Sequence, residues 1–301
     1  MRLDKWLATP GRLASRGRAA AALERGQVFL NGDEVRLAEA GRALTVGDRV
    51  RLWRDRPGSA SVRGPRREGD LVIVYEDEAL LVADKPAGLL TVPTPGGGDR
   101  SLADLVAGHW RSHGKREPMV VHRIDRDTSG LVIFAKDPRA WGALKAQFAR
   151  REPERVYLAV VYGVPEPARG VWRSWLRWDA RALRQVVVAP RSRGGTEAVT
   201  RYAVMRPVAA GAALEVRLVT GRQHQVRVQA WHHGHPLVGE RLYIDEPPGA
   251  LRRGGLPATT AGLSTFPRQA LHAWRLGFVH PRSGLPIVFE SAIPADLRGL
   301  L

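Results

Sequence analysis

Short apolar segments recur along the chain from residue 70 onward and predict a strand-rich domain. Some are continuous, as fully buried strands are, and lie at 71–75, 80–83, 131–135, 156–162, 186–188 and 287–289. Others alternate apolar and polar residues, as half-buried strands do, and lie at 199–205, 214–219 and 272–278. Helical stretches are predicted near 101–112, 138–149 and 223–233. Since predicted strands outnumber predicted helices, we expect an α+β fold with a mixed, largely antiparallel central sheet.

The first 52 residues show a different pattern, which predicts a small α/β module. Apolar positions 3, 6 and 7 have helical spacing, and Ser15 can cap a second helix that Gly26 ends. Two short apolar stretches then flank Asn31-Gly32, a pair typical of a tight hairpin turn. A last strand is expected from the apolar positions 46, 50 and 52.

A linker is expected at residues 53–69, WRDRPGSASVRGPRREG, because this segment is rich in Arg, Pro and Gly and has little to bury. We therefore divide the chain into a module at 1–52, a basic linker at 53–69 and a larger domain at 70–301.

The charge of the chain indicates what it binds. There are 47 Lys and Arg against 30 Asp and Glu, a net charge of +17 at pH 7. This surplus favours a polyanionic partner, although a GC-rich genome would also raise the arginine content. No apolar run reaches the roughly 18 residues that span a bilayer, and no segment has the pattern of a membrane-surface helix. Without cysteines or the apolar core of a signal peptide, we expect a cytoplasmic protein that binds nucleic acid.

Residues 122–131, HRIDRDTSGL, place a dense group of charges directly before a predicted buried strand. Charges beside a core are costly unless they are paired. The segment is therefore either an ion-pair cluster or an active site, with Asp125 and Asp127 as its carboxylates.

A second polar cluster, residues 220–228 with the sequence TGRQHQVRV, lies at a predicted strand-to-helix junction. In a helix over 223–233, Gln223 and Arg227 would lie one turn apart on one face. The neighbouring histidines lack a tight His-x-x-x-His pair and an acidic partner, so we predict no metal site from His224, His232, His233 and His235. A third segment, RVYLAV, places Tyr157 in an apolar strand, which alone is typical of a core tyrosine.

Taken together, HRIDRDTSG, RVYLAVVYG and TGRQHQVRV with GHPLVGERLY resemble the motifs of the RluA family of pseudouridine synthases. The segments VYEDEALLVADKPAGLLTVP, GGTEAVTRYAV and RQALHAWRLGFVHP fit the same family, so the resemblance spans roughly 71–297 in the correct order. It implies the pseudouridine synthase fold and an isomerase that converts uridine in RNA to pseudouridine. That reaction is redox-neutral and releases nothing, so we expect neither a cofactor nor a metal.

The resemblance also implies roles for individual residues. Asp125 matches the essential carboxylate, Tyr157 the tyrosine that contacts the target base, and Arg227 the arginine that pairs with the aspartate. Asp127 is expected to be structural. RNA contacts are expected from Arg123, which matches an arginine near the flipped nucleotide, and from its polar neighbours His122, Arg155, Arg222, Gln223 and His224. Arg155 stands where the family often has lysine, and the charge is retained.

Within residues 1–52, RLDKWLA, SRGRAAAALERGQVFLNG and VGDRV resemble the small RNA-binding domain first seen in ribosomal small-subunit protein S-four. The resemblance implies a basic helical face that grips RNA backbone, with contacts from Arg2, Lys5, Arg12, Arg16 and Arg18. Residues 246–267 look longer than the family's usual connection, and we expect them to touch RNA or to be disordered.

We therefore expect a monomeric pseudouridine synthase with large-subunit ribosomal RNA as its substrate. The alternatives are transfer RNA as the substrate, a non-catalytic RNA-binding factor in ribosome assembly, and a glycosidase-like enzyme with Asp125 and Asp127 as its carboxylate pair. Asp125 is expected to act in its ionised form, either by attacking the anomeric carbon or by removing the ribose 2′ proton.

Overall fold

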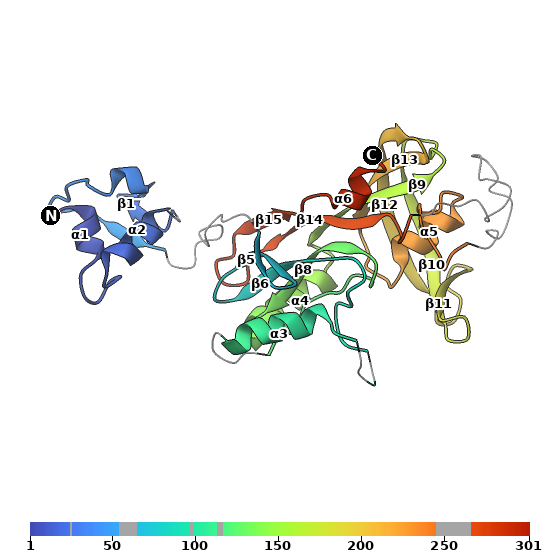
Figure 1. Ribbon diagram of the computed structural model, residues 1–301, viewed down its shortest axis with the longest axis horizontal. Coiled ribbons are helices and arrows are strands. Elements are labelled where there is room, and N and C mark those ends of the chain that lie inside the picture. The colour runs from blue at the N-terminus through green and yellow to red at the C-terminus, as the bar shows by residue number, and fades with distance from the viewer. Residues whose placement is uncertain (25, 54–64, 95, 97–98, 113–116, 245–265) are drawn as a thin grey trace.

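The computed structural model in Figure 1 describes residues 1–24, 26–53, 65–94, 96, 99–112, 117–244 and 266–301. Most of the predicted linker, residues 54–64, and most of the predicted long connection, residues 246–265, lie outside the described residues. In the part of the chain that the structure describes, no helix is long and apolar enough to cross a membrane.

The N-terminal residues form a small unit of helices around a short sheet. Its elements are α1 (Leu3–Leu7), α2 (Arg16–Glu24), β1 (Val28–Leu30), β2 (Asp33–Glu34), the 3-10 helix η1 (Leu37–Glu39) and β3 (Val50–Leu52). The strands pair antiparallel in the order β2-β1-β3. The unit has an apolar core of its own, built from residues such as Leu3, Leu7, Leu23 and Val28.

Local sequence signals explain how this unit folds. The Ser15 hydroxyl accepts a hydrogen bond from the backbone N–H of Arg18 at 3.1 Å and so caps α2, as predicted. Asn31 and Gly32 both have positive φ, as a type I′ hairpin turn requires, and the flanking residues Leu30 and Asp33 pair, which confirms the predicted hairpin. The last strand is shorter than expected, because Val46 lies outside it and is fully exposed.

Among the described residues, twelve strands form one large sheet. Its main path runs β11-β10-β12-β13-β9-β14-β8-β6-β5-β4, with β15 beside β14 and β7 beside β8. The strands are β4 (Arg66–Glu68), β5 (Leu71–Glu76), β6 (Leu80–Lys85), β7 (Met119–Val120), β8 (Ser129–Ala135), β9 (Glu154–Tyr162), β10 (Arg169–Asp179), β11 (Arg184–Val188), β12 (Thr196–Val208), β13 (Gly211–Leu218), β14 (Leu271–Val279) and β15 (Pro286–Glu290).

The strand pairs confirm a mixed and largely antiparallel sheet. Within the described ranges, β8 and β14 are the one parallel pair, and they meet over only two residue pairs, His272 with Ser129 and Ala273 with Gly130. β14 also pairs antiparallel with β9 on its other side. It therefore joins a half of the sheet that ends in β8 to a half that begins with β9.

Three strands of the large sheet were not predicted: β4, the two-residue β7 and β10. β10 carries buried Trp172 and Leu176, but Gly170 before them and Arg173 and Ser174 between them weaken the apolar alternation. β4 consists of exposed residues 66–68, which lie in the segment predicted as a linker and pair with β5 at the edge of the sheet.

Helices α3 (Leu102–Ser112) and α4 (Pro138–Ala149) cover opposite faces of the β5–β6–β8 half. Alternate residues of β6 show this, since Leu81 packs in one apolar cluster with α3 and Leu80 in another with α4. Helix α4 begins with Asp137 as its cap, whose carboxylate accepts from the backbone N–H of Ala140 at 2.8 Å.

Helix α5 (Gln225–His232) lies against β10 and β11 in the other half, as Figure 1 shows, and a short α6 (Ala295–Arg298) ends the fold. The predicted helix over 223–233 is therefore real but starts two residues later. His224 adopts a left-handed backbone conformation with φ of 54°, which excludes it and the residues before it from the helix. The inner face of α5 buries Val228 and Trp231 against Leu176 and Tyr243.

Gly130 provides a test of the junction between the two halves. Its φ is +116°, and a Cβ added there would lie 2.2 Å from the backbone oxygen of Ala273 on β14. We expect Gly130→Ala to lower the free energy of unfolding by roughly 2–4 kcal/mol, measured by urea denaturation. Gly142 in the middle of α4 is the control, because a Cβ there meets nothing within 4 Å. Gly142→Ala should raise stability by up to about 1 kcal/mol, and equal effects at the two sites would contradict the packing described.

Candidate active site

A cavity of about 460 Å³ opens where the two halves of the large sheet meet. One wall is the loop before β8 and the end of α4, and the other is β9, the end of β13 and the start of α5. Asp125, Tyr157 and Arg227, the three residues predicted to act together, all line it. They come from elements far apart in the sequence, so the fold is what brings them together.

The loop that carries Asp125 is held by two anchors from the neighbouring segment. Thr91 Oγ1 donates to the backbone oxygen of Ile124 at 2.7 Å and accepts from its N–H at 3.2 Å. Lys85 is fully buried, and its Nζ donates to the backbone oxygens of Pro86, Leu89 and Arg126 at 2.9, 2.6 and 2.7 Å. Burial lowers the pKa of Lys85 to about 7. Its three acceptors match the three N–H groups of the ammonium form.

Arg227 is buried on α5 and lies between two carboxylates. Its Nε and Nη2 donate to Glu240 at 2.8 and 2.7 Å, a bidentate pair, while its Nη1 lies 3.6 Å from Asp125 Oδ2. The predicted ion pair with Asp125 is thus present, but Glu240 is the closer partner. The Asp125 side chain is 22 % exposed, whereas that of Glu240 is 1 % exposed. Asp125 is therefore the carboxylate that faces the cavity.

Glu240 and Arg227 keep each other charged. Burial works against both charges, but the hydrogen bonds and charge of Arg227 hold the pKa of Glu240 below its usual range. In the same way, Glu240 raises the pKa of Arg227 above its usual value. The backbone N–H groups of Arg241 and Leu242 also donate to Glu240 Oε1, at 3.0 and 2.8 Å. The pair is well satisfied, which a buried ion pair needs in order to be tolerated.

Tyr157 on β9 is buried, and its neighbours in the sheet are Val216 and Ala273. Burial raises the pKa of Tyr157 to about 12. The phenol is therefore neutral at physiological pH, and its ring forms part of the cavity wall.

Arg155, two residues before Tyr157 on β9, also lines the cavity. Its Nη2 donates to the backbone oxygens of Leu218 and Val219 at 3.3 and 3.2 Å, and its guanidinium lies 5.6 Å from the ring centre of Phe148. Gly221 leaves room for it, since a Cβ there would lie 2.4 Å from Arg155 Nη1. Its remaining N–H groups supply positive charge inside the cavity.

His122 lines the cavity as well, but as a neutral ring. It stacks on Phe148 with centroids 4.9 Å apart, and its Nε2 accepts from the backbone N–H of Ile133 at 3.3 Å. Burial, with the charges of Arg155 and Lys145, lowers the pKa of His122 to about 3. It can therefore contribute shape and stacking but no cation for a phosphate.

The turn into α5 differs from the prediction at one residue. Gln223 was expected to share a face with Arg227, but it precedes the helix, is exposed and does not line the cavity. Gln225 lines it instead. Its side-chain Oε1 accepts a hydrogen bond from Thr220 Oγ1, and its Nε2 donates one to Thr200 Oγ1, each at 2.8 Å. The prediction failed because the left-handed conformation of His224 turns the chain just before the helix, so Gln223 does not follow the helical spacing that would place it on the same face as Arg227.

Arg222, His224 and Arg123, for which RNA contacts were predicted, line the cavity. Arg123 is exposed, and Arg222 Nε donates to the backbone oxygen of Glu197 at 3.1 Å. His224 Nδ1 lies 3.1 Å from the Tyr243 hydroxyl, and burial lowers the pKa of His224.

Of the histidines considered as metal ligands, His232 and His233 have ring centroids 5.3 Å apart, whereas His224 lies beside Tyr243. His233 stacks on Trp172 with centroids 5.7 Å apart, and His235 Nδ1 donates to the backbone oxygen of Tyr162 at 3.1 Å. In the described ranges, no group of three or more His, Asp or Glu residues could hold a metal ion.

Several residues of the site were not found from the sequence. Lys145 and Arg151, at the end of α4 and just after it, add positive charge to the cavity, and Tyr243 supports Arg227 with its ring 5.6 Å from the guanidinium. Glu240 had a usable signal, because it is a carboxylate directly after an apolar segment and needs a buried partner. The surface cations had no signal that sets them apart from other exposed Lys and Arg.

The five basic residues predicted in the small N-terminal unit, Arg2, Lys5, Arg12, Arg16 and Arg18, are all exposed. Arg2 pairs with Asp4 at 3.0 Å, and the Arg12 guanidinium lies 3.6 Å from the ring centre of Trp6. These two therefore have local partners, although their side chains remain accessible.

The chain belongs to the RNA pseudouridylate synthase family, whose model matches residues 79–232, and this family consists of enzymes that act on RNA. It is 33 % identical over 305 residues to an RNA pseudouridine synthase of Synechocystis, an alignment that covers 100 % of this chain and 88 % of that protein. It is 37 % identical over 297 residues to the ribosomal large subunit pseudouridine synthase D of Xylella fastidiosa, covering 95 % of this chain and 84 % of that protein.

A solved structure shows the same fold. Human RNA pseudouridylate synthase domain containing 4 superimposes with a TM-score of 0.58 and 25 % identity, covering 75 % of this chain and 90 % of that one. The predicted α+β pseudouridine synthase fold is confirmed, and the chain is an isomerase of RNA uridines of the RluA type.

Glu240→Gln tests whether the buried pair supports the site. The variant leaves the Arg227 charge buried beside a neutral amide, so we expect the free energy of unfolding to fall by about 3 kcal/mol, with a loss of activity. Because the folded-state pKa of Glu240 is lowered, its stabilisation is complete above its unfolded value of about 4.3 and is lost as the pH falls through the folded value. The free energy of unfolding of Glu240→Gln should therefore fall less between pH 7 and pH 3 than that of the wild type.

Glu290→Gln is the matched control, because Glu290 pairs with Arg275 at the surface and exposed pairs contribute little. Urea denaturation between pH 7 and pH 3 measures both variants. Equal stability of the wild type and Glu240→Gln would contradict the central role of the buried pair.

Proposed function

We propose that the enzyme isomerises uridines in large-subunit ribosomal RNA, with Asp125 as its catalytic carboxylate. The observation that carries this proposal is the position of Asp125, which faces the cavity 3.6 Å from Arg227 while Glu240 neutralises that arginine from the other side. Relatives named ribosomal large subunit pseudouridine synthase D, at 35–38 % identity, support the choice of RNA.

The reaction breaks the bond from the ribose C1′ to uracil N1, turns the ring and joins C1′ to C5. The C5 proton is lost and N1 gains a proton, so the product has the atoms of the substrate. Asp125 acts as the ionised group, either on C1′ or on the ribose 2′ proton. Arg227, 3.6 Å away, orients its carboxylate.

The target uridine must leave its RNA helix to reach the cavity, at a cost of a few kcal/mol. Arg123, exposed at the cavity, interacts with the flipped nucleotide or its backbone. Arg155, Lys145, Arg151 and Arg222 attract the phosphates around it. Tyr157 packs against the uracil ring as a neutral phenol that is available for proton transfer at C5.

The small N-terminal unit serves as a second RNA contact. Its exposed basic residues on α1 and α2 and between them are suited to backbone phosphates rather than to bases. We place the enzyme in the cytoplasm and propose that it acts as a monomer, with residues 1–52, 53–69 and 70–301 as its RNA-binding module, linker and catalytic domain.

Asp125→Asn tests the assignment of the catalytic group. We expect it to abolish pseudouridine formation, because an amide can neither attack C1′ nor accept a proton as a carboxylate does, while RNA binding changes less than threefold. Release of tritium from transcripts labelled at uracil C5 measures the reaction, and a filter-binding assay measures affinity.

Asp127→Asn is the control from the same loop and should keep most of the activity. Transcripts of large-subunit ribosomal RNA and of transfer RNA are compared, and faster reaction on transfer RNA would overturn the choice of substrate. Normal turnover by Asp125→Asn would overturn the catalytic assignment itself.

A further inference from the structure

Trp178 is an exposed aromatic residue at the end of a buried strand face. On β10, the alternate residues Trp172, Ser174 and Leu176 are buried, and Trp178 is next on the same face but is 40 % exposed. The apolar core thus ends at Leu176, and the tryptophan ring extends beyond it into solvent. What sets Trp178 apart from Trp141, which is exposed to a similar extent, is therefore its place at the end of this buried row, beside the site.

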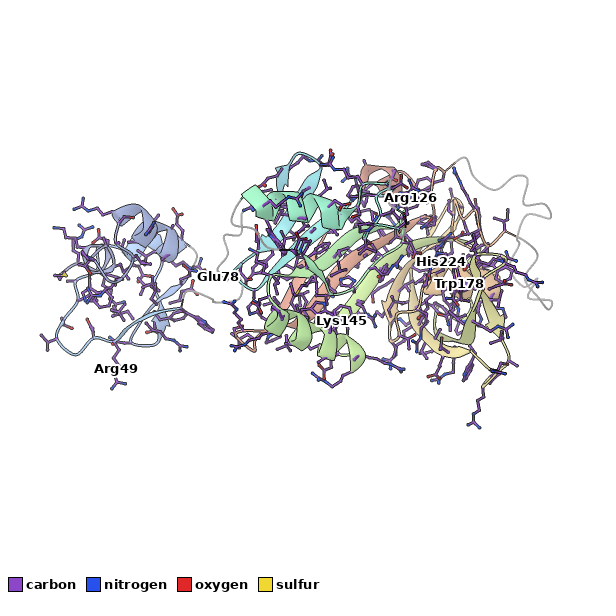
Figure 2. The ribbon with its side chains drawn as sticks, turned by 90° about the horizontal axis from the view of Figure 1, so that it is seen from below. Arg49, Glu78, Arg126, Lys145, Trp178 and His224 are labelled. Atoms are coloured by element: carbon purple, nitrogen blue, oxygen red, sulfur yellow. The ribbon has the colours of Figure 1, made fainter. Side chains whose placement is uncertain are left out.

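The ring lies beside the cavity that contains Asp125. Its centroid is 6.3 Å from that of His224, a cavity residue, and Figure 2 shows Trp178 and His224 next to each other. His224 in turn contacts the Tyr243 hydroxyl, and the ring of Tyr243 lies against Arg227. A continuous set of side chains therefore connects the tryptophan at the rim with the guanidinium beside Asp125.

Hydrogen bonds fix the hairpin that carries the tryptophan. Gln185, the residue paired with Trp178 on β11, donates its N–H to the Tyr243 hydroxyl at 3.0 Å. Arg184 Nη1 donates to the backbone oxygen of Leu242 at 3.1 Å. The ring is thus presented from a strand that is tied to the wall of the site, so its position relative to Asp125 is defined.

The surroundings of the ring are basic. Arg222 and the exposed Arg123 line the cavity, and Arg181 is exposed in the turn of the same hairpin. The carboxylates near His224, those of Asp125 and Glu240, lie beside the buried guanidinium of Arg227. On the strand itself Asp179 is an acidic neighbour, and its Oδ1 accepts from the N–H groups of Arg181 and Ala182 at 2.9 and 3.1 Å. An accessible aromatic face within positive charge is the combination that binds unstacked bases and their phosphates.

We propose that Trp178 is a positioning residue on which a base next to the target uridine stacks. The inference rests on the proposed function, because it assigns an RNA base to the rim of the same site. Flipping a uridine out of a helix leaves its neighbours without a stacking partner. A neighbour that stacks on the tryptophan regains that contact, and the target is held over Asp125 as a result.

A purely structural role of Trp178 predicts different effects of its substitution. If Trp178 only shielded His224, its loss would lower stability and would alter turnover through Arg227, with no particular effect on RNA affinity. Stacking instead predicts a change in KM that another aromatic ring restores. The two roles are therefore separable by kinetics.

Trp178→Ala and Trp178→Phe are compared with the wild type on unmodified large-subunit ribosomal RNA and transfer RNA transcripts, by tritium release from uracil C5. We expect Trp178→Ala to raise KM by on the order of tenfold, the effect of losing one base–aromatic stack, with kcat within about twofold of the wild type. Trp178→Phe should restore KM to within about threefold. Leu183→Ala, which removes an exposed apolar side chain from the same hairpin, is the control and should leave KM unchanged.

An RNA series gives the second measurement. An abasic ribose is placed in turn at each position beside the modified uridine. At one position it should weaken binding to the wild type but add nothing to the defect of Trp178→Ala, because both changes remove the same stack. Normal KM for Trp178→Ala on an RNA that the wild type modifies would overturn this inference alone. A wild type inactive on both RNAs would overturn the proposed function and this inference with it.

Discussion

The site depends on a guanidinium buried between two carboxylates. A charge such as that of Arg227 is tolerated in the interior only when it is fully paired, and Glu240 provides that pairing through two parallel hydrogen bonds and its own backbone contacts. Asp125 is therefore not needed to neutralise the arginine. It remains partly exposed, oriented by the charge at 3.6 Å and free to face a substrate. One carboxylate serves stability, and the other is left for chemistry.

The second constraint is the fixed position of the loop that holds Asp125. The loop has no regular structure of its own, and the contacts of Thr91 and Lys85 substitute for it. A lysine without a carboxylate partner is uncommon in a protein interior. Here its three backbone acceptors tie the end of β6, the following turn and the Asp125 loop to one point. The precision of the site thus comes from the scaffold on which the aspartate lies.

Much of this fold and site could be predicted from the sequence, and the failures have physical causes. The antiparallel strands and the helices α3 and α4 agree with prediction, because apolar periodicity is a local signal. The convergence of Asp125, Tyr157 and Arg227 was implied by the family resemblance and not by any local pattern. The strand β10 was missed because Arg and Gly interrupt its pattern.

Gln223 was misplaced because a single left-handed residue shifts the helix start, and propensity does not report such a conformation. Glu240 and Lys85 were missed because their partners are distant in sequence or are backbone atoms.

The central strand β14, made from residues 271–279 near the C-terminus, has a further consequence for the nascent chain. The small unit has all of its elements once residue 52 has left the ribosome, whereas the two halves of the cavity cannot be joined before β14 has emerged. The order of synthesis thus separates in time the first folded part of the molecule from the assembly of its reaction centre.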